Sequence, residues 1–225
     1  SIRSRPVIIM PSIKQAYGRI IILNGGSSVG KTSLAKAFQD LMLPEIYLLQ
    51  GIDMFWFSLP PKQLDLDRVD PEFYTHTSAM HDGKEEFRIV PGPQLDKLML
   101  GRYKAMSVYL RQGFNIIADE VVWKRSWLEE AIRDLEDFDA YFVNVYCADS
   151  VGEEREKSRG DRHAGWNRCS ARYASMDALY DLSLDTGVLC PEECAELIRS
   201  ALENGLQPTA FDLMKEKFLE IAEHE

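Results

Sequence analysis

Basic side chains are in deficit in this chain. Its 225 residues include 26 Lys and Arg against 36 Asp and Glu, which gives a formal net charge of −10. Because a polyanion is repelled by an acidic surface, this balance argues against a nucleic acid as the main partner. Any site that binds phosphate must therefore be a local basic pocket.

Long apolar runs are also missing. No stretch approaches membrane-spanning length, and residues 1–18 lack the basic start, apolar middle and cleavage site of a secretion signal. The cysteines show neither a C-x-x-C pair nor a zinc-ligand spacing, so we expect reduced thiols. These absences predict a cytoplasmic protein without a membrane partner, and nothing in the sequence indicates an oligomer. The cysteines are Cys147, Cys169, Cys190 and Cys194.

The strongest functional signal lies between Arg19 and Ser33. Residues 20–23 form a β-branched run typical of a central parallel strand, and apolar residues recur at helical spacing over residues 34–42. Between them, residues 25–32 match G-x-x-x-x-G-K-[ST] in the strand, loop and helix order that this phosphate-binding motif requires. The alternative is a Gly/Ser-rich turn before an ordinary helix, and the agreement of all three parts makes it the weaker interpretation.

We expect this loop to bind ATP through its backbone N–H groups. Glycines let those groups turn inward, and the start of the helix near Lys31 adds its positive end. Lys31 is expected to reach the β- and γ-phosphates, and Thr32 to hold Mg²⁺. The expected nucleotide-binding residues are Gly25, Gly26, Ser27, Ser28, Val29, Gly30, Lys31, Thr32 and Ser33.

Two aspartates follow further predicted strands. Residues 46–49 form a short strand that leads through Gly51 to Asp53, and residues 114–118 form a strand that leads to Asp119. Open parallel sheets bind ligands at the carboxyl ends of their strands, so both are candidates. Asp53 is either a catalytic base or a helix cap. Asp119 is either a Mg²⁺ ligand through water or a cap for the next segment.

Three arginines recur at positions i, i+4 and i+7, namely Arg155, Arg159 and Arg162. This spacing places them on one side of a continuous helix, although Gly160 interrupts or ends that helix. One interpretation is a solvated face paired with neighbouring glutamates. The interpretation we favour is a lid segment whose closure brings the guanidinium groups into contact with ATP.

An aromatic stretch and a long excursion follow Asp53. Residues 61–92 show no clear period and contain a candidate hairpin turn at Asp82-Gly83. These aromatic residues either contact an apolar acceptor substrate or pack in the core, and the sequence leaves both interpretations open. These aromatic residues are Phe55, Trp56, Phe57, Phe73 and Tyr74.

Strands and helices alternate along most of the chain. This order predicts an α/β fold with a parallel sheet covered on both faces. Several motifs lie in order along it: Gly51-Ile-Asp53, Gly92-Pro93, Asn115-Ile-Ile-Ala-Asp-Glu120, Arg155-Glu-x-x-Arg-Gly-Asp-Arg162, Tyr180-Asp-Leu-Ser-Leu-Asp-Thr-Gly187 and Pro191-Glu-Glu-Cys-Ala195. Together with the phosphate-binding loop, they resemble the chloramphenicol phosphotransferase family of P-loop kinases over about residues 18–202.

The resemblance implies a three-layer P-loop NTPase of the nucleotide-kinase-like type, with a five-stranded parallel sheet, helices on both faces and a helical lid. Along the chain we expect an N-terminal extension (1–18), a P-loop kinase domain (19–205, lid near 150–175) and a C-terminal helix (206–225). The activity that the resemblance implies is transfer of the ATP γ-phosphate to a hydroxyl of a small molecule, with Mg²⁺. Asp53 matches the family's general base, and Asp119 the carboxylate that ends the third core strand. The lid arginines match Arg155, Arg159 and Arg162.

The chain departs from the family pattern in its two terminal segments, in the aromatic stretch 54–90 and at Trp123-Lys124-Arg125. The last two departures are expected near the acceptor pocket, and they argue against chloramphenicol itself as the acceptor. Another small-molecule or nucleotide kinase shares the same loop, lid and carboxylate, so that function stays open. A nucleotide-regulated binding or switch protein also uses such a loop, although the chain lacks the Asn/Thr-Lys-x-Asp guanine signature.

Overall fold

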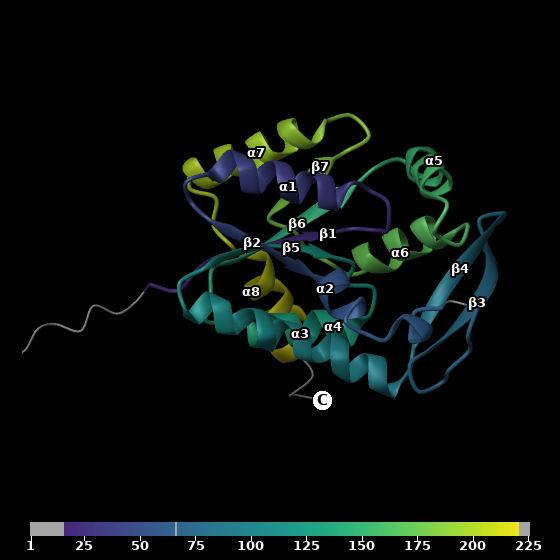
Figure 1. Ribbon diagram of the computed structural model, residues 1–225. Coiled ribbons are helices and arrows are strands. Elements are labelled where there is room, and N and C mark those ends of the chain that lie inside the picture. The colour runs from purple at the N-terminus through teal and green to yellow at the C-terminus, as the bar shows by residue number, and fades with distance from the viewer. Residues whose placement is uncertain (1–15, 66, 221–225) are drawn as a thin grey trace, which may run out of the picture.

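A parallel sheet of five strands forms the centre of the computed structural model, which describes residues 16–65 and 67–220 (Figure 1). Every neighbouring pair of strands is parallel. The prediction of a five-stranded parallel sheet is therefore confirmed. The strands lie in the order β2 (Tyr47–Gly51), β5 (Asn115–Glu120), β1 (Ile20–Asn24), β6 (Ala140–Tyr146) and β7 (Leu182–Asp185).

Side chains alternate along β1 between two apolar layers, as the period of a strand requires. Ile20 and Ile22 belong to one layer, and Ile21 and Leu23 to the other; all four are fully buried. Figure 1 shows helices on both faces of the sheet. The upper layer holds α1 (Lys31–Met42) and α7 (Pro191–Glu203), and the lower layer holds α3 (Pro93–Arg111), α4 (Arg125–Asp134) and α8 (Ala210–Lys215).

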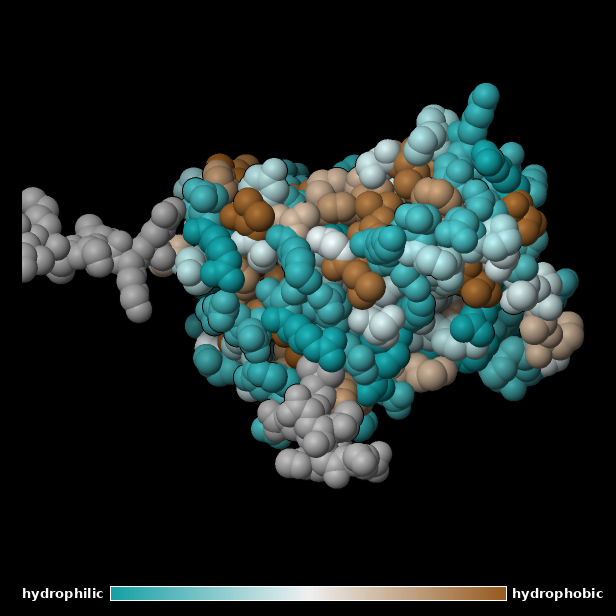
Figure 2. Space-filling view, turned by 90° about the horizontal axis from the view of Figure 1, so that it is seen from below, coloured by the Kyte–Doolittle hydropathy of each residue, from teal (hydrophilic) through white to brown (hydrophobic). Residues whose placement is uncertain are grey.

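The outer face of the lower layer is hydrophilic over most of its area. Figure 2 views the molecule from this side and shows apolar side chains scattered among polar ones. Within the described residues, no helix is long and apolar enough to cross a bilayer.

A short helix, α2 (Ile52–Trp56), follows β2 directly. The long excursion over residues 61–92 then contains a 3₁₀ turn, η1 (Pro61–Gln63), and an antiparallel hairpin of β3 (Tyr74–His81) and β4 (Lys84–Pro91). The hairpin turn is Asp82-Gly83, where both residues have positive φ (48° and 76°), as the favoured hairpin turns require. The predicted hairpin is therefore confirmed.

Two further helices, α5 (Asp149–Arg159) and α6 (Trp166–Ser175), lie close to the hairpin (Figure 1). Lys84 of β4 pairs with Glu153 of α5 at 3.0 Å, and Glu86 pairs with Arg172 of α6 at 2.6 Å. These ion pairs join the hairpin to both helices.

The structure defines the ends of two predicted helices. α5 ends at Arg159 because Gly160 adopts a left-handed conformation (φ 70°), so the predicted end of the helix at Gly160 is confirmed and Arg162 lies beyond the helix. Within the predicted C-terminal helix (206–225), α8 spans Ala210–Lys215 and continues as a π-helical turn, η2 (Glu216–Glu220). Residues 221–225 and most of the N-terminal extension lie outside the described residues.

Candidate active site

The phosphate-binding loop joins the carboxyl end of β1 to α1. A Cβ at Gly25 would lie 2.1 Å from the carbonyl oxygen of Val145, so only glycine allows the loop to pass this close to β6. Ser28 and Gly30 have positive φ (64° and 94°), which turns the backbone sharply before the helix begins at Lys31. The positive end of α1 therefore faces the loop, as anion binding requires.

Lys31 and Thr32 connect this loop to the end of β5. The Lys31 side chain is only 5% exposed; its Nζ donates to the carbonyl oxygen of Gly26 at 2.6 Å and lies 4.0 Å from Asp119. Thr32 Oγ1 donates a 2.5 Å hydrogen bond to Asp119 Oδ2. The structure thus brings together Thr32 and Asp119, the two residues expected to hold Mg²⁺.

These two residues fit a Mg²⁺ site of the kind found in kinases. Mg²⁺ is usually held by one or two protein oxygens together with substrate phosphates and water. No group of three or more His, Cys, Asp or Glu side chains in the described part of the chain is arranged to hold a metal by itself. The Thr32 hydroxyl and the Asp119 carboxylate, which lie beside the phosphate-binding loop, match this set of one or two protein oxygens.

Asp53 lies in the first turn of α2, directly after β2. In the sheet, Gly51 of β2 is the register partner of Asp119 of β5, which places the two carboxylate-bearing strand ends side by side. Burial raises the pKa of Asp53, and the negative charge of Asp119 raises it further. The nearby positive charges of Arg162, Lys31 and Arg159 oppose this shift. Asp53 therefore belongs to a small cluster of opposite charges.

The three candidate arginines have different environments. Arg159 and Arg162 border the same cleft as Lys31 and Asp53. The Nε of Arg162 is buried, lies 4.0 Å from Asp161 and has no hydrogen-bond partner among the described residues. Arg159 Nε lies 3.4 Å from Asp161. Their positions fit side chains that approach a bound phosphate.

Arg155 is instead engaged with the protein backbone. Its Nη1 donates to the carbonyl oxygen of Val29 at 3.2 Å, and its Nη2 donates to the carbonyl oxygen of Thr186 at 2.7 Å. The Thr186 hydroxyl also donates to Val29. These contacts fix the phosphate-binding loop against the segment after β7. The geometry of Arg155 therefore favours a positioning role over contact with the transferred phosphate.

Helix α6 holds the loop from its other side, which sequence reasoning missed. The Ser27 N–H donates to Ser170 Oγ at 2.8 Å, and the Asn167 amide donates to the carbonyl oxygen of Ser27. A Cβ at Gly26 would come within 2.7 Å of Ala171. The sequence showed only an amphipathic helix here, because these pairs are more than a hundred residues apart.

A buried ion pair supports the end of β5. Arg102 of α3 donates to both oxygens of Glu120 at distances of 2.9 to 3.2 Å, and neither side chain is exposed. Burial raises the pKa of Glu120, and the positive charge of Arg102 opposes that shift. Since Glu120 follows Asp119 directly, this pair fixes the strand end that carries the candidate Mg²⁺ ligand.

Two cavities meet at Asp53. The larger, about 800 Å³, extends along the phosphate-binding loop between α5 and the segment after β7. The smaller, about 220 Å³, has aromatic walls that include Trp56, Trp123 and Trp166. Asp53 and Arg162 line both. The two cavities therefore share a carboxylate and a guanidinium.

The aromatic residues expected after Asp53 divide between this smaller cavity and the core. Trp56 and Phe57 line the cavity. Tyr74 is 1% exposed in the core, and Phe55 and Phe73 pack against that core. Packing in or against the core is confirmed for Tyr74, Phe55 and Phe73, and Trp56 also packs against it; contact with an acceptor stays a prediction for Trp56 and Phe57.

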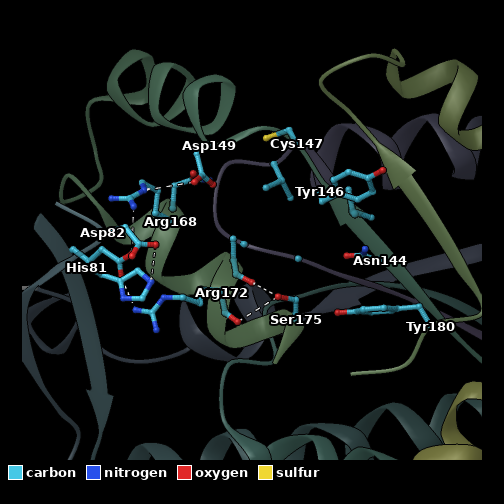
Figure 3. Close-up of a pocket in the computed structure, with 17 residues that line it drawn as sticks. His81, Asp82, Asn144, Tyr146, Cys147, Asp149, Arg168, Arg172, Ser175 and Tyr180 are labelled. Atoms are coloured by element: carbon cyan, nitrogen blue, oxygen red, sulfur yellow. Dashed lines mark hydrogen bonds and ion pairs between the residues drawn. The ribbon is translucent and has the colours of Figure 1, made fainter. Parts of the chain in front are cut away.

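A third cavity, about 370 Å³, lies on the other side of the phosphate-binding loop (Figure 3). Gly25 and Gly26 are part of its wall, whereas Ser28 and Thr32 line the nucleotide cleft. In Figure 3, Arg168 and Arg172 lie on the side of the hairpin tip, and Tyr180 lies on the side of β6. None of the candidate catalytic residues lines this third cavity.

A phosphate-binding loop on a five-stranded parallel sheet, with carboxylates at adjacent strand ends and arginines on a helix opposite, defines a phosphotransferase of the P-loop kinase class. The chain belongs to one family within that class. The sequence model of the chloramphenicol phosphotransferase-like proteins matches residues 18–203. The resemblance inferred from the motifs is confirmed.

A relative of high identity agrees with this assignment, and solved structures share the fold. The chain is 50% identical over 203 residues to "Putative O-phosphotransferase Rv2636" of Mycobacterium tuberculosis, an alignment that covers 90% of each chain. The M. tuberculosis APS kinase CysC, solved with AMPPNP and APS, matches 83% of this chain and 98% of its own with a TM-score of 0.56 at 14% identity.

A gluconokinase of Sinorhizobium meliloti matches 90% of this chain and 98% of its own, with a TM-score of 0.52 at 15% identity. The tunicamycin resistance protein of Deinococcus radiodurans matches 84% of this chain and 97% of its own, with a TM-score of 0.52 at 20% identity. At such identities these structures show a shared fold.

Proposed function

We propose that this protein is an ATP-dependent O-phosphotransferase that moves the γ-phosphate to a hydroxyl of a small molecule. One observation carries the proposal: Asp53 and Arg162 lie where the cleft along the phosphate-binding loop meets the aromatic cavity. Phosphate transfer needs the attacking and leaving oxygens in line, with a carboxylate close to the attacking hydroxyl. The junction of the two cavities offers that arrangement.

The donor side would hold ATP along the loop, residues 25–33. Backbone N–H groups and the start of α1 suit its phosphates, and Lys31 supplies a buried positive charge. Thr32 and Asp119 would hold Mg²⁺, which neutralises charge on the phosphates when it is bound. Arg155 acts on this side as a positioning residue, because it fixes Val29 of the loop.

The chemical step assigns a role to each remaining residue. Asp53 accepts the proton of the acceptor hydroxyl as that oxygen forms its bond to the γ-phosphorus, and the bond between this phosphorus and the leaving oxygen of ADP breaks. Lys31, Arg159 and Arg162 stabilise the charge on the phosphoryl group in transit. The cluster of opposite charges around Asp53 supports this assignment, because each of these cations affects its pKa.

The partner in this proposal is a small hydroxylated acceptor in the aromatic cavity. A switch protein that only binds nucleotide has no need of such a cavity beside its phosphate-binding loop. We also propose a cytoplasmic location, which the four free cysteines support.

The test is an acceptor screen. The protein is incubated with γ-labelled ATP, Mg²⁺ and pooled hydroxylated metabolites and antibiotics, and the products are identified by mass. The proposal predicts one phosphate added to a hydroxyl, with one ADP formed for each product molecule. Nucleotide binding without acceptor-dependent ADP release across a broad screen would instead favour a nucleotide-regulated binding protein.

A further inference from the structure

Helix α6 begins at a residue that has no side chain with which to cap it. Gly165 precedes the helix in a left-handed conformation (φ 88°), and a Cβ there would lie 2.6 Å from the carbonyl oxygen of Glu85 in the hairpin. Only glycine therefore fits at this position. Because the first N–H groups of a helix have no partner within it, an acceptor must come from elsewhere in the fold.

Glu156 of α5 supplies that acceptor. Its Oε2 accepts from the N–H of Gly165 at 3.1 Å, and its Oε1 accepts from the N–H of Asn167 at 2.7 Å. The side chain is 4% exposed, and the positive end of the α6 dipole favours a carboxylate there. Figure 1 shows α5 and α6 side by side, and Glu156 fixes the first turn of α6 in that arrangement.

Asn167 extends this contact to the phosphate-binding loop. Its backbone N–H donates to Glu156, and its side-chain amide donates to the carbonyl oxygen of Ser27. The backbone of α5 restricts that amide, because a Cβ at Gly152 would lie 2.2 Å from Asn167 Oδ1. Ser170 of α6 accepts from the Ser27 N–H at 2.8 Å. A continuous set of hydrogen bonds thus runs from Glu156 through the start of α6 to the loop.

Glu156 itself lines neither of the two cavities that meet at Asp53, whereas Ser27 lines both. We propose that Glu156 is a positioning residue for nucleotide binding. It holds the first turn of α6, and α6 holds Ser27 in the conformation that directs the N–H groups of the loop toward phosphate. The inference rests on the proposed function only in that this loop binds ATP.

Titration calorimetry with ATP and Mg²⁺ tests this role. Glu156→Gln keeps the length of the side chain but leaves one acceptor for two N–H groups, so the Kd for ATP should rise about tenfold, the effect of one lost hydrogen bond. Asp181→Asn is the matched control, because Asp181 Oδ1 accepts from the N–H groups of Thr209 and Ala210 at the start of α8, each at 2.9 Å. Both variants should lower the Tm, but the control should keep its Kd for ATP within about twofold of the wild-type value.

The double variant Glu156→Gln/Asn167→Ala identifies the route of the effect. Since both substitutions break the same set of contacts, the rise in Kd should be smaller than the product of the rises in the two single variants. A rise equal to that product, or an unchanged Kd in Glu156→Gln, would overturn the inference.

Hydrogen exchange of the wild-type protein gives a measurement that requires no variant to fold. Coupling between two sites is reciprocal, so bound AMPPNP should slow exchange at the N–H groups of Gly165 and Asn167 more than at those of Thr209 and Ala210. Equal slowing at the two helix starts would contradict the inference. A wild-type protein that binds no ATP would contradict the proposed function as well, whereas failure of the acceptor screen alone would count against the proposed function only.

Discussion

Thr32 of the phosphate-binding loop donates its hydroxyl hydrogen to Asp119 at the end of β5, over 2.5 Å. The bond joins two segments that are 87 residues apart. It places a hydroxyl and a carboxylate together beside Lys31, where the phosphates of a nucleotide would lie.

The first prediction concerns Mg²⁺. Added Mg²⁺ should tighten ATP binding to the wild-type protein and to Thr32→Ser, which keeps the hydroxyl. In Thr32→Val and in Asp119→Asn, the gain from Mg²⁺ should shrink about tenfold or more, because a cation ligand has been removed. Titration calorimetry with and without the metal measures this difference. An undiminished gain in both variants would show that neither residue holds the ion.

The second prediction separates Arg155 from Arg159. Arg155→Met removes the hydrogen bonds to Val29 and Thr186, so it should raise the KM for ATP and lower the Tm. Arg159→Gln should lower kcat by about tenfold or more with little change in the KM for ATP or in Tm, because the proposed role of this side chain is to stabilise the transferred phosphoryl group. The measurements are steady-state kinetics and thermal unfolding of both variants. The same pattern in both would contradict the separate roles.

The third prediction concerns the buried pair of Arg102 and Glu120. Glu120→Gln leaves a buried guanidinium without its counter-charge, so the free energy of unfolding should fall by about 3–5 kcal/mol. The double variant Arg102→Met/Glu120→Gln removes both charges and should recover part of that loss. Denaturant unfolding of the two variants gives the comparison. A loss below about 1 kcal/mol in Glu120→Gln would show that water reaches this pair.

The sequence predicted those parts of the site that depend on local order along the chain. The loop, Asp53 and Asp119 each follow a short, largely apolar run, and parallel strands bring their carboxyl ends to one edge of the sheet. The hairpin at Asp82-Gly83 was likewise predictable from its turn residues.

The contacts that support the site were not predictable from the sequence alone. Glu120 pairs with Arg102, and Ser27 is held by Ser170, through tertiary contacts that no periodicity records. The spacing of Arg155, Arg159 and Arg162 indicated a shared role, yet Arg155 bonds to the backbone of the phosphate-binding loop. The placement of Trp123 in the cavity wall depends on the packing of three separate segments.

The fourth prediction is a pH dependence. Burial and the charge of Asp119 raise the pKa of Asp53 above the ordinary carboxyl value of about 4. Since the base must be deprotonated to accept a proton, kcat/KM should fall as the pH decreases through that raised pKa. A pH profile of kcat/KM at fixed Mg²⁺ locates the acid limb. An acid limb at or below the ordinary carboxyl value would contradict the raised pKa.

The most direct test of Asp53 as the base is single-turnover phosphate transfer by Asp53→Asn, with the acceptor found in the screen and ATP at saturation. The amide keeps the size of the side chain but cannot accept the proton, so the transfer rate should fall by about 10²–10⁴ while the Kd for ATP stays within about threefold. Asp212→Asn, which alters an exposed carboxylate of α8 that lines neither cavity, serves as the matched control and should keep close to the wild-type rate. Transfer by Asp53→Asn at close to the wild-type rate would contradict the account.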